Sequence, residues 1–198
     1  MLESLENFVE GEMLEGDNAY HCEKCDKKRD TLKRCSIKRL PNILFLELKR
    51  FEFNFDTMSK IKVNDYCSFP MELDMRPYSQ DEIAKKDLKK LMEKQNLTTE
   101  DLNEDQLVTL NKQVSQQYYQ YQLKGVVVHN GTSDSGHYYT FIKDRESSGE
   151  NDWYEFNDTL VNHFNPNDIP AETFGGENEH WEMDLARHQH DPAMQQLL

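Results

Sequence analysis

The chain has 198 residues, of which 36% are hydrophobic and 30% are charged, and its formal net charge is −14. This length is sufficient for one domain with a sizeable core, or for part of a larger domain. The acidic charge argues against nucleic acid and against an anionic membrane as partners, because phosphate groups would be repelled.

The sequence also bears on the compartment. It contains no run of about 18 apolar residues, so we expect no membrane-spanning helix. Residues 1–16 are acidic and lack the basic and then apolar order of an export signal. We therefore expect the chain in the cytoplasm, with the nucleus as the alternative, and we expect its four cysteines to be reduced.

The first part of the chain predicts short elements. Residues 1–19 favour a helical lead-in that ends at the turn Gly16-Asp17-Asn18. The segment Cys22-Glu23-Lys24-Cys25 and the charged residues after it predict a knuckle between two strands. Residues 43–53 give the strongest strand prediction, and apolar residues at both parities indicate that both faces of its first half are largely buried.

The middle of the chain changes in character. Residues 79–118 are rich in Lys, Glu, Asp, Gln and Asn, and they predict an insertion of one or two amphipathic helices in a surface loop. One helix is indicated by Ile83, Leu88 and Leu91 at helical spacing. A second is indicated after the cap-like start at residues 98–101. We interpret this segment as a solvated insertion in preference to a dedicated binding arm.

The chain then returns to strands, and two of them bring polar side chains together. The segments HYYTFIKD (137–144) and WYEFND (153–158) predict adjacent antiparallel strands. If residues whose numbers sum to about 296 pair, Asn157 shares the face of His137 and Asp158 points away, whereas a slip of one residue reverses this. An amide or carboxylate could then accept the Nδ1 proton of His137 and leave Nε2 free to take a proton from a nucleophile. The alternative is a histidine that only hydrogen-bonds at a strand end.

None of the four cysteines has the surroundings of a matching nucleophile, which is commonly a helix N-terminus or a tight polar loop. Cys35 and Cys67 lie in strand-like segments and are expected to be small buried hydrophobic residues. Cys22 and Cys25 form a C-x-x-C, which suits a redox pair or half of a tetrahedral zinc site. No βαβ pattern surrounds it, so the zinc half-site is favoured.

Several motifs in order resemble one family. YHCEKC, LPNILFLELKRFEF, KIKVNDYCSFP, GVVVHNGTSDSGHYYTFIKD and WYEFND are similar to the back half of a ubiquitin-specific protease, from about residue 5 to residue 177. Within the family, YHCEKCDKKRDTLKR, FPMELDMRPY and FGGE resemble the large fat-facets type. The resemblance implies an α+β fold, the antiparallel-sheet palm and fingers portion of a papain-like cysteine protease fold, with the helical insertion. Its partial catalytic domain would cover residues 1–177, followed by an irregular tail at 178–198.

The resemblance also implies roles for individual residues and a partner. His137 matches the catalytic histidine, Asn157 matches the residue that orients it, and Asp158 is the neighbour that can substitute in that role. Ser135, Gly136 and Tyr138 match the approach of the ubiquitin tail, and the loops 54–62 and 130–135 match those that overhang it. Cys22 and Cys25 match the second half of a structural zinc knuckle, and no cofactor is expected for catalysis. The implied partners are ubiquitin and ubiquitinated proteins.

The departures from the family pattern define the expected activity. The cysteine box, which belongs well upstream of the histidine, is not recognisable here, and neither is the closing strand in residues 178–198. We therefore expect a deubiquitinase fragment that carries the His/Asn half of the triad, lacks the nucleophile and is inactive alone. Two alternatives remain: a catalytically inactive ubiquitin-binding protein, and a small zinc-binding module around Cys22 and Cys25.

Overall fold

The computed structural model describes residues 1–146 and 152–176. The chain divides into two compact units. Unit 1 comprises Met1–Leu44 and Glu72–Gln122, and unit 2 comprises Phe45–Met71 and Leu123–Leu198. The predicted tail at 178–198 lies outside the described residues. Among the described residues, no helix combines the length and the apolar character needed to cross a bilayer.

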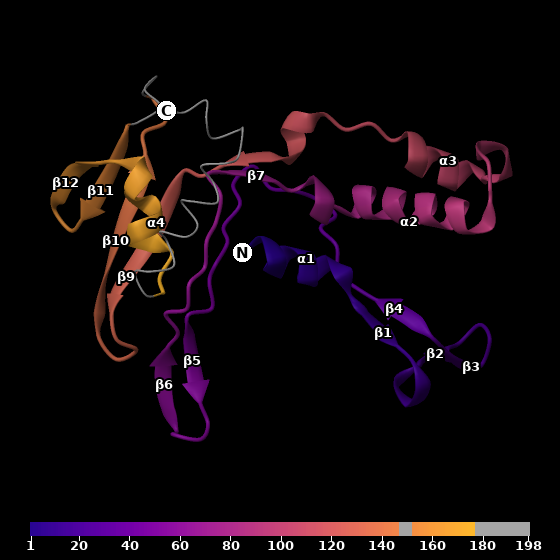
Figure 1. Ribbon diagram of the computed structural model, residues 1–198, viewed down its shortest axis with the longest axis horizontal. Helices are drawn as coiled ribbons and strands as arrows, with labels where there is room; N and C mark the ends of the chain where they lie inside the picture. Colours follow the sequence, from indigo (N-terminus) through magenta and orange to yellow (C-terminus); the bar gives the residue numbers. More distant parts are fainter. Residues whose placement is uncertain (147–151, 177–198) are drawn as a thin grey trace. The chain divides into compact units, whose positions relative to one another are not determined.

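Unit 1 begins with the predicted helical lead-in, but only its first half is an α-helix, and a short strand and a 3-10 turn follow before residue 19 (Figure 1). Two antiparallel strand pairs follow, β1 with β4 and β2 with β3, and the second pair encloses the predicted knuckle. The elements are α1 (Leu2–Glu10), β1 (Glu12–Leu14), η1 (Gly16–Asn18), β2 (Tyr20–Cys22), β3 (Lys27–Arg29) and β4 (Thr31–Lys33).

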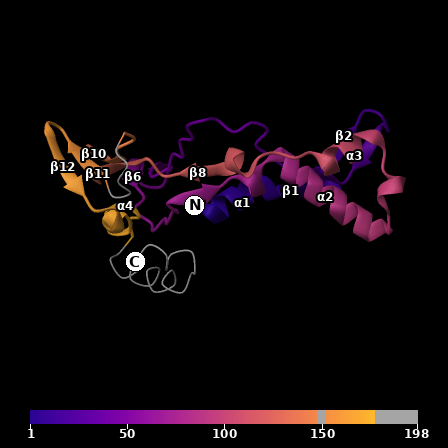
Figure 2. The same ribbon diagram turned by 90° about the horizontal axis from the view of Figure 1, so that it is seen from above.

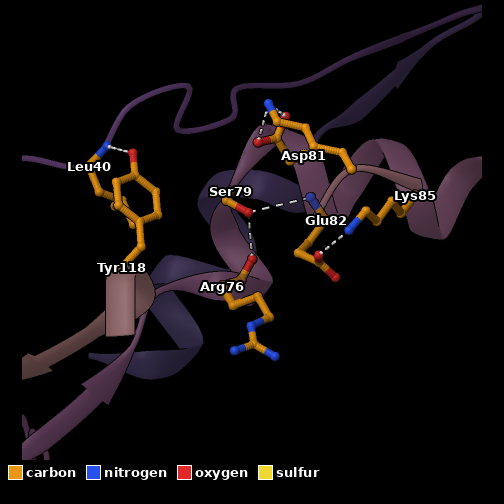
Figure 3. A network of polar contacts seen from close by, with 8 residues as sticks. Leu40, Arg76, Ser79, Asp81, Glu82, Lys85 and Tyr118 are labelled. Carbon is orange, nitrogen blue, oxygen red and sulfur yellow. Dashed lines mark hydrogen bonds and ion pairs between the residues drawn. The ribbon is translucent and has the colours of Figure 1, made fainter. Parts of the chain in front are cut away.

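In the core of unit 1, a strand pair joins the two ends of the helical insertion. Strand β7 (Glu72–Asp74) pairs with β8 (Gln120–Gln122), so the two ends of the inserted segment lie side by side. The side chains beside this pair are buried, and the Leu40 backbone N–H donates a hydrogen bond of 3.0 Å to the Tyr118 hydroxyl (Figure 3). Because the ends of the insertion are fixed by this pair, it adds helices without interrupting the core. The buried residues of the cluster are Leu40, Leu73, Met75, Tyr78 and Tyr119.

The insertion contains the two predicted helices, which lie side by side (Figure 2). Each begins at a polar cap: the Ser79 hydroxyl accepts from the Glu82 N–H, and Asn103 forms a capping box with Gln106. Such caps satisfy backbone donors that a helix start leaves free. The elements are η2 (Arg76–Tyr78), α2 (Gln80–Gln95), η3 (Thr99–Asp101), α3 (Glu104–Asn111) and η4 (Gln116–Tyr119).

Unit 2 is built on a four-stranded antiparallel sheet in the order β12-β11-β10-β9 (Figure 1). The predicted register between its two central strands is confirmed, since Thr140 pairs with Phe156 and Phe141 with Glu155. Aromatic and aliphatic side chains from the sheet and from the following helix form its core, which contains Phe141, Trp153, Ile169 and Phe174. The elements are β9 (Gly125–Gly131), β10 (Gly136–Lys143), β11 (Trp153–Asn157), β12 (Leu160–Phe164), η5 (Pro166–Asp168) and α4 (Ile169–Thr173).

The predicted strand over residues 43–53 is mostly wrong. Only β5 (Phe51–Asn54) forms, and it pairs with β6 (Ser59–Lys62) as a hairpin. Within the described residues no strand pairs with the segment before β5, and a strand without a neighbour lacks the ladder that stabilises it. The expected burial of both faces is also wrong, because Ile43 is 57% exposed and Phe45 is 88% exposed.

Candidate active site

His137 lies at the start of β10 with its imidazole exposed, and its closest polar partner comes from the end of β11. The His137 Nε2 and the Asn157 Oδ1 are 2.7 Å apart. The register explains this contact: continuing the pairing by one residue places Asn157 opposite Tyr139, on the face that His137 shares. The sheet therefore brings the two predicted residues together.

The ring nitrogen involved differs from the expectation, which assigned Nδ1 to the orienting group. The structure has Nε2 facing Asn157. An amide oxygen can only accept a hydrogen bond, so in the neutral imidazole Nε2 carries the proton and donates it. Nδ1 then has the lone pair, and it is the atom available to a nucleophile.

Asp158 is the more distant of the two predicted partners. Its Oδ2 lies 4.0 Å from the His137 Nε2, and its side chain is 79% exposed. It was expected to point away, but β11 ends at Asn157 and Asp158 adopts a left-handed backbone with φ 53°. Strand alternation therefore no longer governs its direction. Water screens a carboxylate at this distance and exposure, so Asn157 is the main partner of His137.

A third polar residue on this face was not predicted. The Asn157 Nδ2 donates a hydrogen bond of 3.3 Å to the Glu155 Oε1. Glu155 precedes Asn157 by two residues in β11, so both side chains leave the same face of the strand. This parity was available in the sequence and could have identified Glu155.

The residues expected near the ubiquitin tail border a pocket of about 490 Å³. It lies between the β5–β6 hairpin and the turn that joins β9 to β10, and Ser135, Gly136 and Tyr138 all line it. The His129 ring packs between two aromatic rings, with centroids 5.0 Å from Phe51 and 4.7 Å from Tyr138. Gly136 lies against this ring, and a Cβ there would overlap with the His129 imidazole.

Two side chains hold the hairpin against the turn. The Lys62 ammonium donates to the carbonyl oxygens of His129 at 2.8 Å and Gly131 at 3.1 Å. The Ser133 hydroxyl donates to the Lys60 carbonyl oxygen at 2.9 Å. The sequence indicated the two loops but not this linkage, because a lysine in a polar loop carries no signal of its partner.

The C-x-x-C lies in the tight turn between β2 and β3. Backbone N–H groups of Cys25 and then Lys24 donate to the Cys22 sulfur and lower the pKa of its thiol. Stabilised thiolates are what a zinc site requires, so this turn fits half of one. Across residues 1–146 and 152–176, no group of three His, Cys, Asp or Glu side chains gathers as a complete site.

The other cysteines are not among the polar partners of His137 that the described residues provide. Within the described parts of the chain, the hydrogen-bond and ion-pair partners of the His137 ring are Asn157 and Asp158. Cys67 is half-buried. Cys35 is exposed, and its expected burial is therefore wrong. Its strand-like segment extends beyond β4, and none of the strand pairs in the described part of the chain includes it.

Comparison with known proteins identifies relatives of the whole segment. Residues 7–185 match the family of ubiquitin carboxyl-terminal hydrolases. Ubiquitin carboxyl-terminal hydrolase 9X of Mus musculus is 43% identical over 185 residues, which cover 89% of this chain and 7% of that protein. The probable ubiquitin carboxyl-terminal hydrolase FAF of Drosophila melanogaster is 39% identical over 196 residues, which cover 96% of this chain and 6% of that protein.

Solved structures agree with this relationship. One chain of the SAGA Ubp8/Sgf11/Sus1/Sgf73 DUB module bound to ubiquitin aldehyde matches with a TM-score of 0.60 and 27% identity. The match covers 88% of this chain and 32% of that one. A SAGA DUB module with a substituted Ubp8, bound to monoubiquitin, gives a TM-score of 0.58 at 28% identity, over 88% of this chain and 31% of that one. These matches, with the mixed helices and antiparallel sheets, confirm an α+β papain-like fold, and the chain belongs to the ubiquitin carboxyl-terminal hydrolase family, among the ubiquitin-specific proteases related to fat facets.

Proposed function

We propose that this chain supplies the general-base half of a thiol-dependent deubiquitinase, which hydrolyses the isopeptide bond after the C-terminal glycine of ubiquitin. The observation that carries the proposal is the 2.7 Å contact between His137 and Asn157 on adjacent strands. It is supported by family membership and by the ubiquitin ligands named in the matched structures. The chain spans 7% of the length of the 9X relative, so the activity belongs to the proposal.

The contact defines the chemistry that His137 can perform. Its Nδ1 takes the proton of a cysteine thiol, and the thiolate attacks the carbonyl carbon of the scissile bond. The imidazolium then returns the proton to the departing amine, and an acyl-enzyme thioester remains for water to hydrolyse. A base within reach contributes about 10²–10⁴-fold. Asn157 holds the ring in place through both transfers, and Asp158 is the neighbouring carboxylate that can take over this role.

The pocket that Tyr138, the neighbour of His137 in β10, helps to line is the proposed approach for the ubiquitin tail. Ser135, Gly136 and Tyr138 line it, and the hairpin and turn that form it correspond to the predicted overhanging loops. The proposed partners are ubiquitin and ubiquitinated proteins. The net charge of −14 disfavours nucleic acid and anionic membranes. We propose the cytoplasm as the compartment, with the nucleus as the alternative.

We also propose a structural role for zinc. Cys22 and Cys25 would supply two of the four ligands that such a site needs, and the ion would hold the β2–β3 turn together. The remaining two ligands would have to come from other residues. Zinc would take no part in the hydrolysis.

The test separates catalysis from binding. The purified chain is incubated with a fluorogenic ubiquitin substrate, alone and with the upstream segment of a relative that contains the cysteine box. We expect no hydrolysis by the chain alone, because the cysteine box of the family is not recognisable in its sequence. We expect hydrolysis in the mixture and its loss in the variant His137→Ala. Hydrolysis by the chain alone that is lost in His137→Ala would place the nucleophile in this sequence and contradict the proposal.

Binding to unmodified ubiquitin decides the alternative. The pocket favours binding whether or not a nucleophile is supplied, so we expect shifts in ubiquitin NMR signals near its C-terminus. Binding without hydrolysis in the mixture would favour a catalytically inactive ubiquitin-binding protein. Neither binding nor hydrolysis, together with half an equivalent of zinc per chain in a dimer, would favour a small zinc-binding module.

A further inference from the structure

We propose that Glu155 is a positioning residue, which selects the neutral tautomer of His137 through the side-chain amide of Asn157. The three side chains form a chain of contacts on one face of the sheet. Glu155 Oε1 accepts from the Asn157 Nδ2 at 3.3 Å, and the Asn157 Oδ1 lies 2.7 Å from the His137 Nε2. Both Glu155 and Asn157 are half-buried, and both belong to β11.

The middle member of this chain needs its orientation fixed. The oxygen and nitrogen ends of an amide have the same shape but opposite hydrogen-bond chemistry, so an isolated asparagine can present either end. A carboxylate only accepts hydrogen bonds. Glu155 therefore requires the Nδ2 end of Asn157, since a flipped amide would place oxygen against oxygen. This argument depends on the chemistry of the groups and not on which amide atom was assigned to which end.

The fixed amide in turn determines where the imidazole carries its proton. Oδ1 can only accept, so the His137 Nε2 must hold a proton and donate it. Nδ1 is then unprotonated and able to act as the base. If the amide flipped, Nδ2 would require an unprotonated Nε2 and the proton would move to Nδ1, which would block the base. This inference rests on the proposed function for its catalytic meaning, whereas the tautomer itself is measurable without turnover.

A nearby tyrosine provides an internal check on the charge of Glu155. Burial raises the pKa of Tyr139, and the negative charges of Glu172 and Glu155 raise it further. Both carboxylates therefore act on the same phenol, but of the two only Glu155 accepts a hydrogen bond from Asn157. Glu172 is thus a matched control, because its neutralisation removes a similar charge without touching the amide.

The experiment measures the imidazole ¹⁵N chemical shifts of His137 in the full chain. These shifts distinguish a protonated ring nitrogen from an unprotonated one, and the spectra are recorded at about pH 9, above the range in which imidazoles ordinarily titrate. We expect the Nε2–H tautomer in the wild type. Glu155→Gln keeps the shape but can donate as well as accept, so the amide loses its preference, and we expect the Nδ1–H tautomer to rise to roughly half.

Two further variants make the result decisive. Glu155→Gln combined with Asn157→Asp exchanges amide and carboxylate at equal charge, and the acceptor-only Asp should restore the Nε2–H tautomer. Glu172→Gln should leave the tautomer unchanged while lowering the pKa of Tyr139, as Glu155→Gln also should in a folded sheet. The inference is overturned by an Nδ1–H tautomer in the wild type, by no change in Glu155→Gln, or by no restoration in the double variant. If the mixture with the upstream segment showed no hydrolysis, the proposed function would fail, but the tautomers expected of these variants would stay the same.

Discussion

Replacing Arg50 with methionine should destabilise unit 2 by about 2–3 kcal/mol. The guanidinium donates to three backbone carbonyl oxygens: Val63 at 3.3 Å, Asp65 at 2.8 Å and Phe174 at 3.0 Å. It therefore ties the segment before β5 to the segment after β6 and to the end of α4. One side chain thus joins the two ends of the β5–β6 hairpin to a residue 124 positions further along the chain.

The magnitude follows from the three bonds. A hydrogen bond to a charged group contributes about 1.5–3 kcal/mol, and partial solvent exposure reduces this to about 1 kcal/mol for each of the two shorter bonds here. The longer bond to Val63 adds less. Methionine preserves most of the apolar stem, so the loss reports the polar contacts. Arg50→Lys keeps the charge but not the fork, and its cost should be intermediate.

Urea unfolding followed by the fluorescence of the buried Trp153 measures this loss, in a Trp181→Phe background so that one tryptophan reports. With a slope of about 1–3 kcal/mol per molar, the midpoint should fall by roughly 1 M or more. Lys49→Met is the matched control. Its exposed ion pair with Glu52 spans 4.0 Å and should contribute less than about 1 kcal/mol. If Arg50→Met costs no more than Lys49→Met, the reasoning is refuted.

Two further predictions concern the sheet of unit 2. Gly136→Ala should lower the free energy of unfolding by about 1–3 kcal/mol and weaken ubiquitin binding, because the added Cβ overlaps with the His129 ring. Unchanged stability together with unchanged affinity in titration calorimetry would contradict this. The raised pKa of Tyr139, caused by burial and then by Glu172 and Glu155, gives stability that is fully present below about pH 10 and is lost as the pH rises through the folded-state value. Tyr139→Phe should therefore alter how the urea midpoint changes between about pH 9 and 11, and a pH dependence identical to that of the wild type would show that another group causes it.

The geometry that brings His137 to Asn157 could be predicted from the sequence, because strand alternation fixes which side chains share a face once the register is known. The pairing of Thr140 with Phe156 has the predicted register. Which ring nitrogen faces the amide could not be predicted, since it depends on the side-chain torsions of one exposed residue. The direction of the Asp158 side chain could not be predicted for a related reason, because the alternation of side chains between the two faces ends where the strand ends.

The prediction from apolar composition failed where the burial of a strand depends on a neighbouring strand. Residues 43–53 have the pattern of a strand buried on both faces, but only their last part, from Phe51 onward, belongs to β5, since a strand requires a neighbour that the sequence does not name. Lys62 was missed because its partners are backbone carbonyl oxygens that only the folded sheet supplies, whereas Glu155 could have been identified from the face that it shares with Asn157.

The left-handed backbone at Asp158 affects how mutational data near His137 must be interpreted. Aspartate, asparagine and glycine tolerate this conformation, whereas alanine there adds about 1 kcal/mol of backbone strain. The backbone geometry alone therefore explains why an aspartate occurs at the turn between β11 and β12, independently of the charge of its carboxylate. An alanine scan would confound the two effects. Asp158→Asn and Asp158→Gly remove the charge and keep the turn, so any change they share measures the electrostatic contribution of that carboxylate by itself.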